Sequence, residues 1–269
     1  MSVTRLDIKV LDKVWGSPQT SPWHDNPAAA PIGEIWFGAS DFVPLLVKLL
    51  FTSDNLSVQV HPDDAYAHTH HQSRGKTEMW HILRADPGAK IAVALKESIT
   101  PDHLRQAALS GEIINLLHWI EVAPGQTYFV PAGTIHALGG GLVVCEVQQH
   151  SDVTYRLFDY GRPRELHLDD GIAVSHLGPY DALVKPVDLS PAKQLLAESQ
   201  YFRTEKWTVK DVLGAPNPAK PTIYVALEGE GTIAGTDFRA GEAFEAAAGT
   251  QGFDIASESA VFLVTSEPA

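Results

Sequence analysis

The sequence predicts an all-β protein in which two tandem β-barrels of the jelly-roll type are accompanied by a few short helices. Three observations support this fold class. Short runs rich in Val, Ile, Phe, Tyr and Trp alternate with clusters of Gly, Pro and Asp, a pattern typical of strands. Helical periodicity is scarce. Part of the first half of the chain also recurs in the second half.

The expected elements follow from local pattern. Apolar, β-branched runs predict strands at residues 56–61, 77–83, 90–95, 127–130, 141–147, 223–227 and 260–265. A helix is predicted at residues 101–110, because Thr100 can cap its start, Pro101 suits the first helical position and Gly111 suits the end. A second short helix is predicted around residues 191–199.

An internal repeat suggests that the two barrels are related. Residues 125–136 align with residues 241–252 at a constant offset of 116, and Ala-Gly-Thr recurs in both. Upstream, residues 76–85 resemble residues 220–229. His136 has Gly252 as its counterpart, so we expect the function to lie in the first copy. Chance similarity between two β segments is the alternative.

The repeat and a proline-rich connection predict three regions. Residues 1–162 would form the N-terminal, metal-binding domain, and residues 206–269 a degenerate C-terminal β domain. Residues 163–205, which contain several prolines and a predicted short helix, would link or support them.

Composition limits the partners. Acidic residues outnumber basic ones 33 to 20, which gives a net charge of −13 and argues against nucleic acid or a membrane surface as partner. Residues 48–164 are nearly balanced, with 10 basic and 12 acidic residues. The only cysteine, Cys145, cannot form an internal disulfide, and the N-terminal residues lack a signal-peptide pattern. We therefore expect a cytoplasmic protein, monomeric in the first instance, with an oligomer left open.

Polar residues on predicted strands form a constellation suited to metal chemistry. Alternation places Ser57, Gln59 and His61 on one strand face. Lys76, Glu78 and Trp80 share a face of the next strand, and a turn at residues 131–135 delivers His136. Two imidazoles, a carboxylate and an amide oxygen suit zinc or another divalent first-row ion. For the first strand, a half-exposed surface is the alternative.

A further polar segment spans residues 145–162. If it is extended, Asp152, Thr154 and Arg156 project together. Glu146 stands in an otherwise apolar strand, which indicates either a functional carboxylate or a structural ion pair. By contrast, we interpret the histidines at positions 68, 70 and 71 as part of a solvated polar loop.

Four ordered motifs make a resemblance specific. LSVQVHPDD, GKTEMWHIL, FVPAGTIHALGGG and CEVQQHSDVTYRLFDYGR resemble successive signatures of the type I phosphomannose isomerases, zinc-dependent members of the cupin superfamily. The resemblance runs from about residue 32 to residue 162 and is loose in the C-terminal half. The chain is short for this family and lacks the large helical domain of its longer members.

The resemblance implies tandem cupin barrels and an isomerase that interconverts mannose 6-phosphate and fructose 6-phosphate through an enediolate. It implies one zinc ion per chain and a small sugar phosphate as substrate. By position, the implied residues are the metal ligands Gln59, His61, Glu78 and His136, the catalytic residues Arg156, Lys76, Glu146 and Asp152, and the substrate-binding residues Ser57, Lys48 and Arg162.

Two alternatives stay open at this stage. The chain could be a metal-dependent cupin that acts on another sugar or sugar phosphate, or a sugar-binding cupin without catalysis. Gln59 argues against an oxygen-activating enzyme, whose metal site would be dominated by histidines. The general base also stays open among Glu146, Asp152 and Lys76.

Overall fold

The structure, a computed structural model, describes residues 3–268. Strands dominate, and the helices are short, which confirms the predicted all-β class. The chain divides into two compact units: Met1–Asp12, Ser17–Leu49 and Val184–Ala269 form the first, and Lys13–Gly16 and Leu50–Leu183 form the second. Within residues 3–268, no helix combines the length and apolar character needed to cross a bilayer.

The first unit is built around one large antiparallel sheet. Its strands follow the order β1-β19-β16-β20-β15-β14-β13, and a hairpin of β17 and β18 pairs with β20. The bounds are β1 Val3–Arg5, β13 Val187–Ser190, β14 Lys193–Glu198, β15 Arg203–Ala215, β16 Thr222–Glu228, β17 Glu230–Ile233, β18 Thr236–Arg239, β19 Ala243–Ala246 and β20 Phe253–Ser266. β2 (Asp7–Ser17) pairs antiparallel with β3 (Ile32–Gly38), and β4 spans Leu45–Thr52.

The second unit contains two groups of strands and the four helices found within residues 3–268. One sheet has the order β12-β5-β10-β7-β8, and β6 pairs on its two sides with β11 and β9. The bounds are β5 Val58–Val60, β6 Glu78–Ala85, β7 Lys90–Leu95, β8 Leu117–Glu121, β9 Thr127–Val130, β10 His136–Leu138, β11 Leu142–Gln149, β12 Tyr155–Phe158, α1 Asp64–His71, α2 Pro101–Ser110, α3 Ile113–Leu116 and α4 Leu168–Val174.

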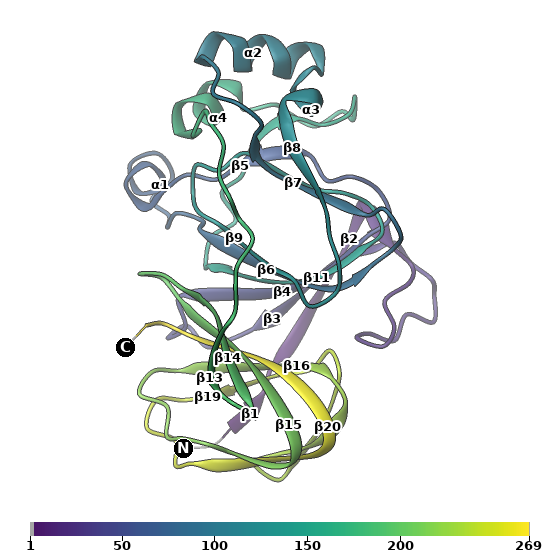
Figure 1. Ribbon diagram of the computed structural model, residues 1–269, viewed down its shortest axis with the longest axis vertical. Helices are drawn as coiled ribbons and strands as arrows, with labels where there is room; N and C mark the ends of the chain where they lie inside the picture. Colours follow the sequence, from purple (N-terminus) through teal and green to yellow (C-terminus); the bar gives the residue numbers. More distant parts are fainter. Residues whose placement is uncertain (1–2, 269) are drawn as a thin grey trace. The chain divides into compact units, whose positions relative to one another are not determined.

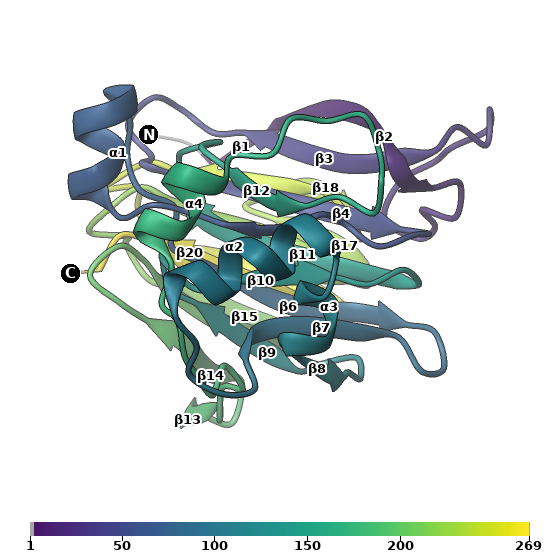
Figure 2. The ribbon, with the colours of Figure 1, turned by 90° about the horizontal axis from the view of Figure 1, so that it is seen from above.

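Two apolar clusters fix this unit. Trp80, Ile82 and Val144 of β6 and β11 pack with Ile91 and Val93 of β7, so this cluster joins the two groups of strands. On the other face of the five-stranded sheet, side chains of α2 and α3 pack against β5 and β10. Figures 1 and 2 both show α2, α3 and α4 over this sheet. The helices thus cover the outer face, and the inner face carries the first apolar cluster.

The two halves of the repeat adopt matching local conformations. Gly125 and its counterpart Gly241 have φ of 86° and 89°, and Gly133 and Gly249 have 85° and 72°. Thr134 N donates to Pro131 O at 3.1 Å, and Thr250 N donates to Ala247 O at 3.0 Å. β6 and β16, which contain the upstream pair of segments, are both strands.

Most predicted elements are confirmed, and two are wrong. All seven predicted strands fall on strands, and the helix at 101–110 is α2, with the Thr100 side chain accepting from His103 N. The helix predicted around 191–199 is wrong, because Lys193–Glu198 is β14. Its Lys, Gln, Leu and Ala residues favour a helix, but pairing with β13 and β15 overrides this weak preference.

The loop predicted for the three clustered histidines is also wrong, although all three are exposed, as the prediction of a solvated segment requires. They lie in the second half of α1, whose start is capped by Asp63 through a bond from Tyr66 N. The Tyr66 and His70 rings stack one turn apart, at 3.9 Å between centroids. His71 Nε2 lies 2.6 Å from the hydroxyl of Tyr155 in β12. Local capping and this tertiary contact therefore order a segment that composition alone assigns to a loop.

The Tyr155 contact allows a test of stability. Tyr155 is 2% exposed. Burial, with a smaller contribution from Asp170, raises its pKa to about 12, so the neutral phenol is favoured in the folded state. Its contribution to stability is therefore complete below the ordinary tyrosine pKa of about 10 and lost as pH rises towards 12. We expect Tyr155→Phe to lower the free energy of unfolding by about 1 kcal/mol at pH 7, measured by urea denaturation, and to flatten the loss of stability above pH 10.

A double-mutant cycle supplies the control. His71→Ala should cost a similar amount, and the double variant should cost less than the sum of the two. Strict additivity of the two losses would contradict a direct stabilising bond between these side chains.

Candidate metal and active site

Three buried side chains meet on the inner side of the second unit. His61 follows β5, Glu78 begins β6 and His136 begins β10. Glu78 Oε2 lies 3.5 Å from His61 Nε2, and Glu78 Oε1 lies 3.4 Å from His136 Nε2. The three residues are 2%, 0% and 1% exposed. Among residues 3–268, they form the group of at least three His, Cys, Asp or Glu side chains whose ligand atoms all lie within 4.8 Å of one another.

Main-chain carbonyls set the tautomer of both histidines. His61 Nδ1 lies 3.0 Å from Val153 O, and His136 Nδ1 lies 2.8 Å from Thr134 O. Because a carbonyl only accepts, each Nδ1 carries the hydrogen, and each Nε2 has a lone pair on the side where Glu78 lies. Burial, followed by the nearby Lys76 charge, lowers the pKa of His136 to about 4. His136 is therefore neutral at physiological pH, the form that binds a metal.

Lys76 brings a positive charge into this group. It is 4% exposed, its Nζ donates to His61 Nε2 at 2.9 Å, and it also contacts Glu78 Oε2. Lone pairs on two imidazoles and the oxygens of one carboxylate thus converge in a buried space. This mixed nitrogen and oxygen set fits a divalent first-row ion.

Gln59, the fourth predicted ligand, lies beside His136. In the strand register it stands opposite both His136 in β10 and Arg156 in β12. Its Nε2 is 3.3 Å from His136 Nε2, and the Ser57 hydroxyl donates to its Oε1 at 3.2 Å. The polar face predicted for this strand is therefore real, and Val58 and Val60 point to the apolar side under the helices.

Glu146 lies on the facing strands. It is 4% exposed in β11, opposite Trp80 of β6, whose Nε1 donates to Glu146 Oε2 at 2.9 Å. The Trp80 ring contacts the His136 ring edge-on, with centroids 5.3 Å apart. Trp80 thus holds a buried carboxylate next to the histidine and carboxylate group.

Arg156 and Asp152 differ in their surroundings. Arg156 is half-buried in β12, and its Nη1 donates to Glu165 O at 2.8 Å. Burial, and then the charge of Arg164, lowers its pKa from the ordinary value. Asp152 is exposed and lies before β12, which begins at Tyr155. Of the segment from Asp152 to Arg156, only the last two residues lie in a strand.

The residues predicted to bind the phosphate lie in separate surroundings. Ser57 is buried next to Gln59. Arg162 donates to Asp54 Oδ2 at 2.6 Å and to Asp159 Oδ1 at 3.2 Å. Lys48 belongs to the first compact unit, where its Nζ lies 3.9 Å from Glu34 Oε2 and 4.7 Å from the Trp36 ring centroid. Their roles at a phosphate stay predictions.

The structure also identifies neighbours that the motif comparison did not single out. Trp80 orients Glu146, the carbonyls of Thr134 and Val153 orient the histidines, and Gln148 stands opposite Glu78 in the β11 and β6 pair. Alternation along 142–149 could have indicated Gln148, because it shares a strand face with Glu146. The carbonyl contacts leave no such signal in the sequence.

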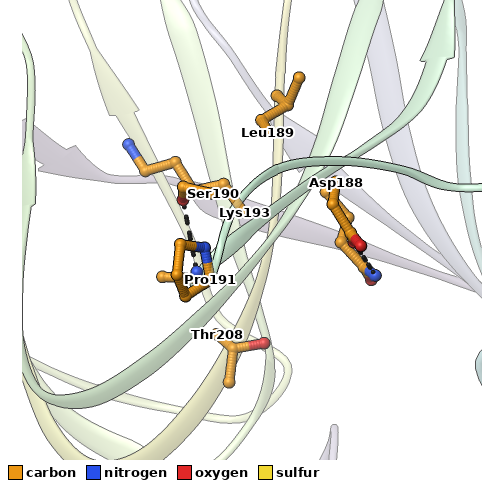
Figure 3. Close-up of a pocket in the computed structure, with 8 residues that line it drawn as sticks. Asp188, Leu189, Ser190, Pro191, Lys193 and Thr208 are labelled. Carbon is orange, nitrogen blue, oxygen red and sulfur yellow. Dashed lines mark hydrogen bonds between the residues drawn. The ribbon is translucent and has the colours of Figure 1, made fainter.

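A cavity in the first unit is distinct from this group. A cavity of about 540 Å³ lies beside the turn between β13 and β14. Asp188, Ser190, Lys193 and Thr208 are among the residues that line it (Figure 3). Asp188 Oδ1 accepts from Gln194 Nε2 at 2.8 Å, and Ser190 Oγ accepts from Ala192 N. None of the predicted site residues lines it. Fold and site together define an all-β protein with a buried group of the metal-binding type.

Comparisons with known proteins identify the family. The mannose-6-phosphate isomerase of Streptococcus mutans is 38% identical over 208 residues, covering 72% of this chain and 64% of that enzyme. A mannose-6-phosphate isomerase of Bacillus subtilis is 35% identical over 221 residues, covering 75% of this chain and 70% of that enzyme. The chain matches no protein-family model. This chain belongs to the mannose-6-phosphate isomerase family, which confirms the resemblance seen in its motifs.

Solved structures agree with this assignment. The mannose 6-phosphate isomerase from Bacillus subtilis superposes with a TM-score of 0.90 at 26% identity, covering 98% of this chain and 99% of that one. A mutant of phosphomannose isomerase from Salmonella typhimurium superposes with a TM-score of 0.82 at 17% identity, which shows a shared fold. The chain spans less than two thirds of the Streptococcus mutans enzyme that it matches.

Proposed function

We propose that this protein is a zinc-dependent aldose–ketose isomerase that interconverts mannose 6-phosphate and fructose 6-phosphate. The observation that carries the proposal is the buried convergence of His61, Glu78 and His136, with Lys76 and Glu146 beside them. Membership of the mannose-6-phosphate isomerase family supports the substrate. A binding protein without catalysis needs neither a second buried carboxylate nor a cationic group at such a site.

The proposed metal site takes one zinc ion per chain. His61, Glu78 and His136 would hold it. Gln59 would be the fourth ligand through Oε1 after its amide turns over, because Nε2, which cannot bind a metal, is the amide atom that lies 3.3 Å from His136 Nε2. When bound, the metal polarises the oxygens beside the reacting carbons and lowers the cost of their negative charge. The backbone contacts to both Nδ1 atoms support this set, because ligating histidines commonly donate their other ring hydrogen to an acceptor.

The proposed reaction moves a proton between C2 of the aldose and C1 of the ketose through an enediolate. Among the candidate bases, Glu146 is the buried carboxylate outside the metal group, whereas Asp152 is exposed. We assign proton removal and return to Glu146, held by Trp80. Lys76 would donate to a sugar oxygen during ring opening, and Arg156 would place a cation towards the developing enediolate charge.

The phosphate end can be tested through Arg162, whose guanidinium we place with Ser57 at that end. We expect Arg162→Ala to raise the KM for mannose 6-phosphate by about 10- to 100-fold, because charge-assisted hydrogen bonds to a dianion are lost. The value of kcat should change less. Steady-state kinetics measure both, and inhibition by inorganic phosphate should weaken in parallel.

Arg105→Ala is a suitable control, because Arg105 is half exposed and pairs with Asp169 on the surface. It should leave KM unchanged. An Arg162→Ala enzyme with the KM of the wild type would remove Arg162 from the phosphate site.

One assay tests the proposed function as a whole. Metal-loaded protein is given mannose 6-phosphate in a coupled assay for fructose 6-phosphate, before and after chelation, and the assay is repeated with unphosphorylated mannose. We expect turnover of the phosphate ester that stops on chelation and returns with zinc. No turnover of either sugar would rule out the function, and turnover that survives metal removal would rule out the metal's role.

We also propose that each half is a cupin barrel. The matching turns at Gly133 and Gly249, and the strands β6 and β16 at corresponding positions, support a duplicated unit. A single, buried and unpaired cysteine supports our prediction of a cytoplasmic protein. The predicted monomer and the predicted domain boundaries at residues 162 and 205 stay predictions.

A further inference from the structure

Gln148 is a completely buried glutamine beside the candidate metal group. It is 0% exposed and lies near the end of β11, where Gln148 and Glu78 are direct partners in the register. Directly paired residues of an antiparallel ladder project to the same side. Along β11, Leu142 and Val144 belong to the inner apolar cluster, so alternation places Glu146 and Gln148 on this same inner face.

Main-chain contacts fix the Gln148 amide. Its Nε2 donates to Gln149 O at 3.0 Å and also to Ser151 O. Both amide hydrogens are therefore used, and the carbonyl oxygen cannot exchange places with the nitrogen without losing both bonds. Within residues 3–268, Oε1 is buried and accepts no hydrogen bond. Buried acceptors without a hydrogen-bond partner are rare in proteins, so this one calls for an explanation.

The chemistry of the neighbourhood selects the ligand group. Glu78 and Glu146 are acceptors on the same face as Gln148. A ligand group that binds among these three side chains must therefore donate a hydrogen bond. A hydroxyl suits this position, because it can donate to Gln148 Oε1 and still accept from a cation such as Lys76. A glutamine oxygen also stays an acceptor at every physiological pH, unlike a carboxylate that can be protonated.

We propose that Gln148 is a specificity-determining residue that accepts a hydrogen bond from one hydroxyl group of the sugar chain. The inference builds on the proposed isomerase function and extends it to a residue outside the assigned metal, catalytic and phosphate-binding sets. The backbone-anchored amide makes this acceptor rigid, so a substrate lacking the matching hydroxyl leaves it unsatisfied. The site thereby discriminates against deoxy sugars.

Binding of polyol phosphates tests the inference without turnover. Sorbitol 6-phosphate and its monodeoxy derivatives have no carbonyl to isomerise, and calorimetry gives their Kd for zinc-loaded wild type and Gln148→Met. We expect the variant to bind the parent polyol about tenfold more weakly. One deoxy derivative should bind both proteins equally, and metal analysis should show the same zinc content in both.

Two further variants separate specificity from stability. Gln148→Glu keeps the reach of the side chain but replaces the nitrogen that donates to Gln149 O and Ser151 O by an oxygen, so the acceptor is no longer anchored and the discrimination against that one deoxy derivative should weaken. Gln149→Met removes a buried glutamine that accepts from Thr77 N at 2.9 Å and donates to Asp64. It should lower the melting temperature but keep the wild-type ranking of the derivatives.

The outcomes are distinct. The inference would be overturned if every deoxy derivative lost the same affinity, relative to the parent polyol, in wild type and in Gln148→Met. It would also be overturned if no polyol phosphate bound, or if Gln148→Met lost its zinc. If mannose 6-phosphate is turned over but Gln148→Met does not change the discrimination against one deoxy derivative, the inference fails and the proposed function stands. If that discrimination depends on Gln148 but no turnover is found, the proposed function fails and the role of Gln148 stands.

Discussion

His136→Ala is expected to lose its bound metal and at least 1000-fold in isomerase activity, the order of loss expected when an essential group is removed. His136 is 1% exposed and contributes one of two imidazole Nε2 atoms to a group that also contains Glu78. A small aliphatic side chain offers no lone pair there, and the remaining set has one imidazole, one carboxylate and the weakly binding amide of Gln59, so the ion should be held too loosely to survive dialysis. Metal analysis after dialysis and the coupled assay measure the two effects.

A second buried histidine provides the matched control. His81 is 3% exposed in β6, and its Nδ1 lies 2.9 Å from Thr127 Oγ1. Alternation places it on the opposite strand face from Glu78 and Trp80. His81→Ala should lower stability to a similar extent but keep the metal. A His136→Ala protein with its full metal content would contradict the ligand role.

Glu146→Gln is expected to lower kcat by about 100- to 10,000-fold, the range usual for loss of a general base. The amide keeps the shape of the carboxylate but cannot take the proton from carbon. Because Glu146 lies outside the metal group, zinc content should stay unchanged. Exchange of the C2 proton of the substrate with solvent, followed by NMR, should disappear together with turnover.

Trp80→Phe separates orientation from chemistry. It removes the indole N–H that holds Glu146 Oε2 at 2.9 Å but leaves the carboxylate in place. We expect a smaller loss in kcat than for Glu146→Gln and an altered pH profile of kcat.

Retention of wild-type proton exchange by Glu146→Gln would remove Glu146 as the base.

Sequence periodicity predicts this protein well wherever one strand face is apolar and the other polar. Val58 and Val60 point to the covered face of their sheet, and Gln59 points to the site, as alternation predicts. Glu146 gives a weaker signal, because the residues before it in its strand are apolar on both faces, and its inner position is known only from the structure. Seven strands with strong β-branched or aromatic runs could be predicted from local pattern, whereas others, such as β2 and β15, are not among the predictions.

Where tertiary contacts decide, the sequence is a weaker guide. Lys193–Glu198 has helical composition but becomes a strand through its two neighbours, and α1 is ordered by a cap and by Tyr155. Arg162 is a cation in sequence, but its bonds to Asp54 and Asp159 emerge only in three dimensions. The orientation of each histidine likewise depends on backbone atoms that no residue type reveals.

The carbonyl contacts of His61 and His136 have a consequence for mutational drift. Their acceptors, Val153 O and Thr134 O, are main-chain atoms, so changing either side chain does not delete them. The tautomers can be lost only when the backbone path shifts. Gly133, next to Thr134, has φ +85°, and a Cβ there would lie 2.9 Å from Val174 O. Substitutions at residues 134 and 153 should therefore leave the orientation of the two histidines intact, whereas a substitution at Gly133 should disturb it.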